Sequence, residues 1–318
     1  MTGDTALKTP QEKLPVTVVG AGLMGHGIAQ VFAAAGHATT LTDIHADTLR
    51  AAPRQIARNL EQMAVAPDEV LAKLRLEASL ARAVAHAGLV IEAAAERIEL
   101  KQQLFADIAA AAPGTAILAS NTSVIPITRI GRDLDPAARA RLVGTHWWNP
   151  PHLIPLVEVV RTAFTTDAVF EHTLALLRAA GKQPVKVLKD VPGFIGNRLQ
   201  HALWREALSL VHQGVCDAGT IDQVVKRGFG LRMSVLGPME NADLVGLELI
   251  RSVHQLLFPD LDGSATPSPL LTELLDQGRP GMRAGQGLLD WTPEQADAVR
   301  DRLARHLIAL QAGASPDA

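Results

Sequence analysis

The chain has 318 residues, of which 47% are hydrophobic and 20% charged, so it is long and apolar enough for two domains with cores of their own. Its formal net charge of −3, without a long basic block, argues against binding to nucleic acid or to an anionic membrane surface. The single cysteine, Cys216, excludes an internal disulfide and a cysteine-based metal cluster, and no metal is expected.

The first predicted element is a strand over residues 16–19, which runs directly into a glycine-rich turn and then a helix over residues 26–35. Gly20 allows the tight turn, Gly22 lets the backbone approach a pyrophosphate, and Gly25 lets the helix pack close to the strand. The free N–H groups at the helix start then face the phosphates. The alternative is a glycine-rich turn that binds nothing. The predicted cofactor contacts in this turn are Gly20, Gly22, Leu23, Met24 and Gly25.

The next predicted strand, residues 38–42, ends on Asp43. A carboxylate about 20 residues beyond the glycines accepts hydrogen bonds from the adenosine ribose hydroxyls. It also repels a 2′-phosphate, and no arginine stands at residues 44–46 to attract one. The sequence therefore predicts NAD rather than NADP as the cofactor.

Strands and helices continue to alternate up to about residue 190, which is typical of a doubly wound, mostly parallel sheet. The predicted helices cover residues 46–63, 68–74, 99–112 and 166–180, and the predicted strands cover residues 89–93, 116–120, 142–146, 156–160 and 184–188. Beyond residue 191 only helices are expected, over residues 195–213, 221–227, 244–257, 270–277 and 293–310. The predicted fold is an N-terminal Rossmann-type α/β domain (14–190) followed by an all-α domain (191–318) for substrate binding and dimerisation.

Oxidation of an alcohol by a nicotinamide cofactor needs a base, and histidine is the usual choice because it titrates near working pH. His146 ends a predicted strand, and ligands in open α/β sheets sit at the carboxyl ends of strands. Glu158 lies on the following strand, where it could orient the ring, and Ser123 closes a polar cluster aimed at the same crevice. From spacing alone, a strand-end histidine with a satisfied hydrogen bond is the alternative.

Five motifs, in this order along the chain, resemble those of the L-3-hydroxyacyl-CoA dehydrogenase family. They are Ser120-Asn121-Thr122-Ser123, His146-Trp147-Trp148-Asn149-Pro150, Leu156-Val157-Glu158-Val159, Pro192-Gly193-Phe194-Ile195-Gly196-Asn197-Arg198 and Gly237-Pro238-Met239-Glu240. The resemblance covers residues 16 to about 291. It implies that His146 is the base and Glu158 its partner, and that Ser123 and Asn197 hold the substrate oxygen. The further cofactor contacts that it implies are Glu96, Lys101, Asn121 and Asn149.

Several neighbours of these residues carry weaker expectations. Trp147 and Trp148 stand where the family usually carries two phenylalanines, and we expect them to serve in packing. His152, in the loop between base and acid, is a candidate pocket residue or a plain loop residue. His201 lies one helical turn beyond Asn197, and a contact with substrate is the less favoured interpretation of it.

The chain departs from the acyl-CoA members of the family in ways that leave the substrate open. Pro155 stands where those members typically carry a lysine, and residues 47–80, where they tend to carry a lysine-bearing arm, hold five basic and five acidic residues. The chain also continues beyond Trp291 into another helix. The family's commonest activity, interconversion of 3-hydroxyacyl-CoA (such as 3-hydroxybutyryl-CoA) and its 3-keto product in fatty acid metabolism, is the first hypothesis. The alternatives are a dehydrogenase of a small non-CoA substrate, of the gulonate, carnitine or pyridine-alcohol type, and a non-catalytic, crystallin-like NAD binder.

The expected partners are a small-molecule substrate and a second copy of the chain, since family members dimerise through the helical domain. The first dozen residues lack the long apolar stretch of a signal peptide, and no apolar run approaches a membrane span. The sequence therefore predicts a cytoplasmic location.

Overall fold

The structure, a computed structural model, describes residues 13–313. The first dozen residues and residues 314–318, to which some of the predictions refer, lie outside this range. Contacts divide the described chain into two compact units, one of residues 13–198 with 306–313 and one of residues 199–305. The contacts therefore keep residues 191–198 and the end of the last helix with the first unit.

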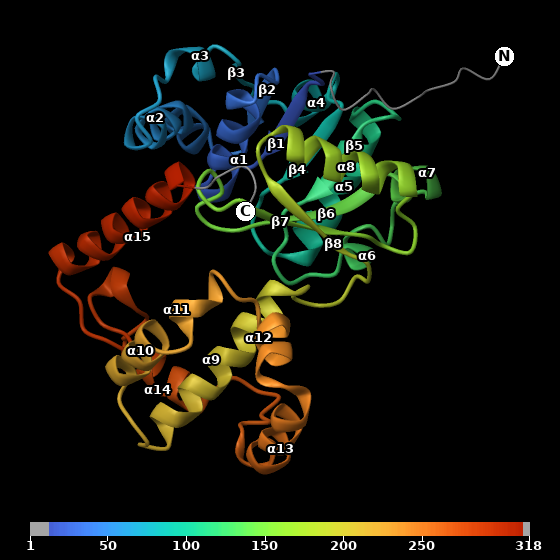
Figure 1. The fold of residues 1–318 in the computed structure, drawn as a ribbon. Helices are drawn as coiled ribbons and strands as arrows, with labels where there is room; N and C mark the ends of the chain where they lie inside the picture. The colour runs from blue at the N-terminus through green and yellow to red at the C-terminus, as the bar shows by residue number, and fades with distance from the viewer. Residues whose placement is uncertain (1–12, 314–318) are drawn as a thin grey trace. The chain divides into compact units, whose positions relative to one another are not determined.

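The first unit is built on one eight-stranded sheet with the order β3-β2-β1-β4-β5-β6-β7-β8 (Figure 1). Its strands are β1 (Val16–Val19), β2 (Thr39–Thr42), β3 (Leu74–Leu76), β4 (Leu89–Glu92), β5 (Ile117–Ser120), β6 (Leu142–Trp147), β7 (Leu156–Val160) and β8 (Gln183–Val187). All neighbouring strands are parallel except β6 and β7, which are antiparallel. The predicted α/β class, a doubly wound and mostly parallel sheet, is confirmed.

Helices cover both faces of this sheet because successive strand residues point to opposite sides. Leu89 and Ile91 of β4 join the core beneath α1, α2 and α8, whereas Val90 between them joins the core beneath α4 to α7. The helices are α1 (Leu23–Ala34), α2 (Ala46–Gln62), α3 (Asp68–Leu71), α4 (Leu80–Val84), α5 (Ile98–Ala111), α6 (Ile127–Ile130), α7 (Pro136–Ala140) and α8 (Asp167–Ala179).

The helix predicted over residues 68–74 is wrong at its end. Helix α3 stops at Leu71, and Leu74 begins β3, which pairs in parallel with the edge of β2. Pairing with the sheet supplies hydrogen bonds that a local pattern cannot reveal, so tertiary context overrides propensity here. The short helices α4, α6 and α7 were also not predicted.

The second unit is helical, as predicted. Its helices are the main part of α9 (Gly196–His212), α10 (Ala218–Arg227), α11 (Gly230–Met233), α12 (Pro238–Val245), α13 (Leu247–Leu257), η1 (Phe258–Asp260), α14 (Pro269–Asp276), η2 (Met282–Ala284) and the first part of α15 (Pro293–Gly313). The single helix predicted over residues 244–257 is wrong, because Gly246, with φ at +98°, separates α12 from α13. No helix among the described residues is long and apolar enough to cross a membrane.

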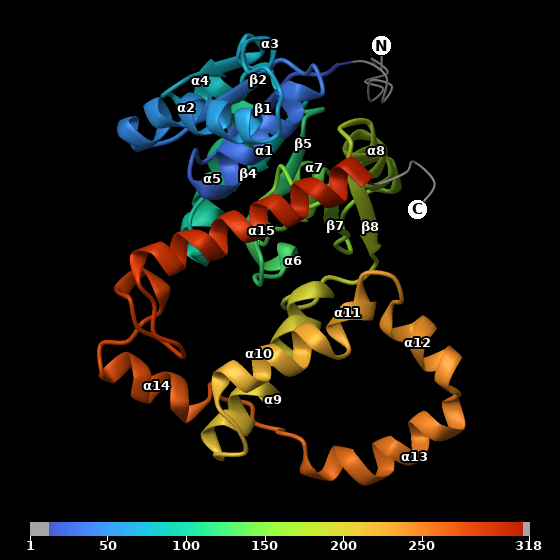
Figure 2. The same ribbon diagram turned by 60° about the vertical axis from the view of Figure 1, so that its left-hand side comes forward.

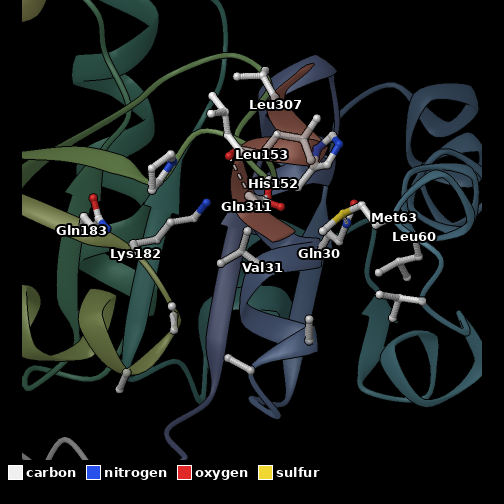
Figure 3. Close-up of a pocket in the computed structure, with 18 residues that line it drawn as sticks. Gln30, Val31, Leu60, Met63, His152, Leu153, Lys182, Gln183, Leu307 and Gln311 are labelled. Carbon is white, nitrogen blue, oxygen red and sulfur yellow. Dashed lines mark hydrogen bonds between the residues drawn. The ribbon is translucent and has the colours of Figure 1, made fainter. Parts of the chain in front are cut away.

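The end of α15 packs on the first unit (Figure 2). Together with α1, the end of α2 and the turn from α8 to β8, it borders a cavity of about 720 Å³ (Figure 3). Leu307 and Leu310 line this cavity, and the Gln311 amide donates to the carbonyl oxygens of Leu153 (2.7 Å) and His152 (3.3 Å). The last turns of the chain therefore contact the loop between β6 and β7.

Candidate active site

The glycine turn between β1 and α1 has the geometry that a pyrophosphate requires. Gly20 has φ of +103°, and a Cβ on it would lie 2.6 Å from the Ala93 carbonyl oxygen. A Cβ on Gly25 would lie 1.7 Å from the Gly20 carbonyl oxygen, so helix and strand can approach only without one. Gly22, by contrast, faces open space, with nothing within 4 Å of its would-be Cβ. Two glycines thus serve the fold, and the third leaves room at the N-terminus of α1 for a ligand.

Asp43 lies at the end of β2 beside this turn. One carboxylate oxygen accepts from the Ala21 N–H (2.7 Å) and the other from the His45 N–H (2.8 Å). The carboxylate is only half-buried, so it remains accessible to a polar ligand. Leu23 and Met24 are the first residues of α1, directly after the open Gly22. The residues predicted to hold NAD on this side therefore lie together, and their chemistry fits an adenosine diphosphate.

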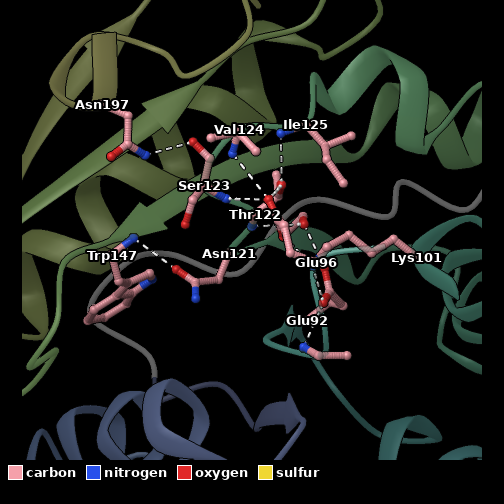
Figure 4. A network of polar contacts seen from close by, with 12 residues as sticks. Glu92, Glu96, Lys101, Asn121, Thr122, Ser123, Val124, Ile125, Trp147 and Asn197 are labelled. Atoms are coloured by element: carbon pink, nitrogen blue, oxygen red, sulfur yellow. Dashed lines mark hydrogen bonds and ion pairs between the residues drawn. The ribbon is translucent and has the colours of Figure 1, made fainter. Parts of the chain in front are cut away.

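Glu96 and Lys101 belong to a buried polar network at the ends of β4 and β5 (Figure 4). The Lys101 ammonium is 1% exposed and contacts Glu92 at 2.7 Å and Glu96 at 3.3 Å. The ammonium therefore pairs with the Glu96 carboxylate inside the protein and does not face solvent. Sequence reasoning missed Glu92, although an acid inside the apolar run of residues 89–93 was the available signal.

Glu96 in turn organises the backbone that carries Ser123. One oxygen accepts from the Thr122 hydroxyl and from the N–H groups of Ser123 and Val124. Burial opposes ionisation of this carboxyl, but these hydrogen bonds and the charge of Lys101 prevail, so its pKa lies below the ordinary value. Glu96 is thus an ionised acceptor with a partly exposed face.

The three asparagines predicted for the site, Asn121, Asn149 and Asn197, differ in their contacts. The Asn121 carbonyl oxygen accepts from the Trp147 N–H at 2.9 Å, which ties β5 to the end of β6. The Asn197 amide, at the start of α9, donates to the Ser123 carbonyl oxygen at 2.9 Å. The structure therefore brings Ser123 and Asn197 together across 74 residues of sequence. Asn149 is exposed at the beginning of the β6–β7 loop.

His146 and Glu158 form a buried pair on two antiparallel strands. The register of β6 and β7 places the two residues directly opposite each other. The ring Nδ1 lies 2.7 Å from Glu158 Oε2, and the two side chains are 5% and 1% exposed. Because an ionised carboxylate can only accept, Nδ1 carries the hydrogen and Nε2 is left free to act as a base.

The second oxygen of Glu158 is held by backbone. It accepts from the N–H groups of Ile195 (2.9 Å) and Gly196 (3.0 Å). Burial would raise the pKa of Glu158, but the hydrogen bonds from His146 and from these two amides outweigh it, and the pKa is lowered. Sequence reasoning missed these amide donors, because backbone donors carry no signature in residue type.

Two aromatic rings lie beside His146. Trp148 and Phe194 have ring centroids 5.2 and 5.8 Å from that of His146. The Trp148 ring also presses on Gly196, where a Cβ would lie 2.3 Å from a ring carbon. Trp147 is 2% exposed and packs near Phe32 in the core, which is the packing role expected of it. His201 lies in the second unit with its ring edge-on to Trp204.

Comparison with known proteins decides the family. Residues 15–191 match the family described as "3-hydroxyacyl-CoA dehydrogenase, NAD binding domain", and residues 193–291 match its C-terminal domain. The chain belongs to the 3-hydroxyacyl-CoA dehydrogenase family. It is accordingly an NAD-dependent oxidoreductase that acts on a hydroxyl group, and the expected cofactor is confirmed as NAD.

The relatives of this dehydrogenase differ in their substrates. The chain is 34% identical over 307 residues to 5-formyl-3-hydroxy-2-methylpyridine 4-carboxylate 5-dehydrogenase of Mesorhizobium japonicum, covering 93% of this chain and 96% of the relative. It is 37% identical over 285 residues to 3-hydroxybutyryl-CoA dehydrogenase of Bradyrhizobium diazoefficiens, covering 87% and 94%. A crystal structure of the pyridine-carboxylate enzyme, described as an NAD⁺-dependent dismutase, aligns with a TM-score of 0.87 and 34% identity over 94% of this chain and 98% of that one.

Proposed function

We propose that this dehydrogenase oxidises a hydroxyl-bearing carbon of its substrate with His146 as the general base and Glu158 as its partner. The observation that carries the proposal is the buried 2.7 Å contact between His146 Nδ1 and Glu158 Oε2, which leaves Nε2 as the proton acceptor. Bound NAD supplies the hydride acceptor. Glu158, ionised and fixed by two amides, holds the ring and stabilises the imidazolium that forms when Nε2 takes the hydroxyl proton.

Ser123 and Asn197 are proposed to hold the substrate oxygen. Ser123 lies in the turn whose N–H groups donate to Glu96, and Asn197, at the start of α9, contacts it through the side-chain amide. A serine hydroxyl and an asparagine amide can both donate to an oxygen that gains carbonyl character. Asp43 and the glycine turn are proposed to hold the adenosine half of the cofactor, and Glu96, Asn121 and Asn149 the nicotinamide half, with Lys101 acting through Glu96.

For the substrate, we propose a small hydroxy compound without coenzyme A. The phosphates of coenzyme A need cationic partners. In the stretch of residues 47–80 the five basic residues are balanced by five acidic ones, and the structure already pairs Arg50 with Asp47 and Arg75 with Glu77. The Mesorhizobium relative, whose name specifies a pyridine carboxylate, supports the same class.

A 3-hydroxyacyl-CoA is the second candidate. It is favoured by the 37% identity to 3-hydroxybutyryl-CoA dehydrogenase over nearly the whole of that relative. The reaction and the roles of His146 and Glu158 are the same for both substrate classes.

A substrate panel with NAD separates the two candidates. NADH formation at 340 nm would be followed with 3-hydroxybutyryl-CoA, free 3-hydroxybutyrate, carnitine, gulonate and hydroxymethyl or formyl pyridine carboxylates. We expect a higher kcat/KM with one of the compounds that lack coenzyme A. A preference for 3-hydroxybutyryl-CoA would overturn the substrate assignment, and no turnover by the panel would count against the proposed chemistry.

We also propose that the protein forms a homodimer through the helical unit. No residue of α9 to α14 is buried within the single chain, and large apolar side chains such as Leu203, Trp204, Leu244 and Leu256 are exposed. An apolar surface of this kind is typical of a subunit interface. Light scattering after gel filtration should give twice the chain mass of 33.8 kDa, and a monomer at micromolar concentration would contradict the proposal.

A further inference from the structure

The loop of residues 148–155 joins the two strands that carry His146 and Glu158. Its backbone turns back on itself, with the N–H groups of Leu153 and Ile154 donating to the Pro150 carbonyl oxygen at 3.1 and 3.0 Å. β6 and β7 pair directly on either side of it, with Trp147 opposite Val157 and His146 opposite Glu158.

Lys182, just before β8, contacts this loop through its side chain. Its side chain is buried, and its ammonium donates to the carbonyl oxygens of Pro151 (2.6 Å) and Ile154 (2.9 Å). The same ammonium lies 5.5 Å from the centre of the Trp147 ring, the neighbour of His146. No carboxylate within residues 13–313 forms an ion pair with it.

A buried lysine without an acidic partner is unfavourable, and burial lowers the pKa of Lys182 to about 8. An apolar side chain of similar length would fill the same space without that cost. The two carbonyl oxygens are therefore the feature that requires a lysine here.

Gln311 contacts the same loop from the end of α15 (Figure 3). Its amide donates to the Leu153 and His152 carbonyl oxygens, so four carbonyl groups of one short loop accept from two side chains that are 129 residues apart in the chain, 182 to 311. Gln311 lies beyond residue 291, where the match to the family's C-terminal domain ends.

We propose that Lys182 is a positioning residue for the His146–Glu158 pair and that it acts by fixing the loop of residues 148–155. Gln311 is the second residue that fixes this loop. The inference rests on the proposed function of that pair. Neither side chain touches the reacting atoms, so both act through the strand ends. A displacement of about 1 Å at such a site can lower kcat by roughly 100-fold. Loss of the contacts that fix this loop is therefore expected to lower kcat.

The test is Lys182→Met, with Lys186→Met as the matched control. Lys186 stands on β8 itself, but it is half-exposed and pairs with Glu171, away from the loop. Three quantities would be measured: amide hydrogen exchange of a peptide covering residues 150–156, the Kd for NADH, and kcat with the best panel substrate. We expect Lys182→Met to accelerate exchange in this peptide and to lower kcat by about tenfold while Kd stays within about twofold. Lys186→Met should change none of the three.

An unchanged kcat and unchanged loop exchange in Lys182→Met would overturn the proposal. So would a lower melting temperature with an unchanged kcat per folded site, because that would be a purely structural role. If Lys182→Met does not fold, Gln311→Ala, at an exposed position, provides the test. We then expect faster exchange in the same peptide and a kcat about twofold lower. No change in either quantity would overturn the proposal. If the wild-type enzyme turns over no panel substrate, the proposed function fails. Amide exchange in the loop peptide still shows whether Lys182 and Gln311 fix the loop.

Discussion

The glycine turn and the His146–Glu158 pair are both parts of the proposed active site, yet they are built in different ways. The turn is made of consecutive residues and works through its backbone, with side chains excluded at Gly20 and Gly25. The pair is made of two side chains from adjacent strands, and it is completed by the amides of Ile195 and Gly196 from a distant segment. Under the proposed function, cofactor binding would therefore depend on local geometry, and the chemical step on long-range assembly.

This difference predicts that substitutions in the two regions should separate. Changes at the pair should lower kcat and spare cofactor affinity, and changes at the turn should do the reverse. The following variants test that separation, beginning with the largest expected effect.

His146→Gln should lower kcat by about 10³-fold, because it removes the general base. The Kd for NADH should stay near that of the wild type, since the ring does not contact the glycine turn. Steady-state kinetics and NADH fluorescence titration measure the two effects, and the exposed His86→Gln serves as control. Near-normal turnover would remove His146 from its proposed role.

Glu158→Gln should lower kcat through the wrong tautomer of His146 by roughly 100-fold, the lower end of what general-base catalysis contributes. The glutamine oxygen can still accept from Ile195 and Gly196, so its NH₂ group faces Nδ1 and forces the ring hydrogen onto Nε2. Resonances of ¹⁵N-labelled histidine should report this exchange of roles between the nitrogens. Full activity with an unchanged spectrum would show that Glu158 does not set the tautomer.

Gly22→Ala should weaken NADH binding by roughly tenfold and leave the fold intact, because its Cβ enters open space that a pyrophosphate would occupy. Gly25→Ala is the contrasting variant, since its Cβ would collide with the Gly20 carbonyl group and should destabilise the protein itself. Calorimetry and thermal unfolding distinguish the two. Equal losses of stability in both variants would contradict the separation.

Asp43→Asn should reduce the preference for NAD over NADP by several-fold. The amide retains an oxygen for the Ala21 N–H but loses the charge that repels a 2′-phosphate. The ratio of kcat/KM for the two cofactors measures the effect. An unchanged ratio would mean that the ribose is recognised elsewhere.

The smallest expected effect is on stability at acid pH. The pKa of Glu158 is lowered in the folded protein, so its contribution is fully present above the unfolded value of about 4.5 and is lost as pH falls through the folded value. Urea unfolding between pH 6 and pH 3 should therefore show a steeper loss of stability for the wild type than for Glu158→Gln. Parallel curves would show that the carboxylate is not stabilised by folding.

The sequence was sufficient for the parts of the molecule that are local. The succession of residues 16–43 predicted a strand, a glycine turn, a helix, a second strand and a terminal acid, and Asp43 indeed contacts the turn. The period-two pairing of β6 and β7 also explains why His146 and Glu158 meet, although which strands were neighbours had to come from the fold. The family resemblance added the remaining residues of the site.

The parts that could not be predicted depend on contacts between distant segments. Lys101 was expected at the cofactor, and the sequence did not reveal that its ammonium lies between Glu92 and Glu96, two acids that offset the cost of burying its charge. Neither Lys182 nor Gln311 was predicted to matter, since their partners are backbone carbonyl groups of a loop. Residue type alone does not reveal such partners.

The contact between Trp148 and Gly196 has a practical consequence for redesign. The indole ring occupies the volume that any side chain at position 196 would need, so the two positions compete for one space beside His146. A smaller residue at 148 would vacate that space, and only then could 196 be enlarged. Mutant libraries aimed at new substrates should therefore vary residues 148 and 196 together rather than one at a time.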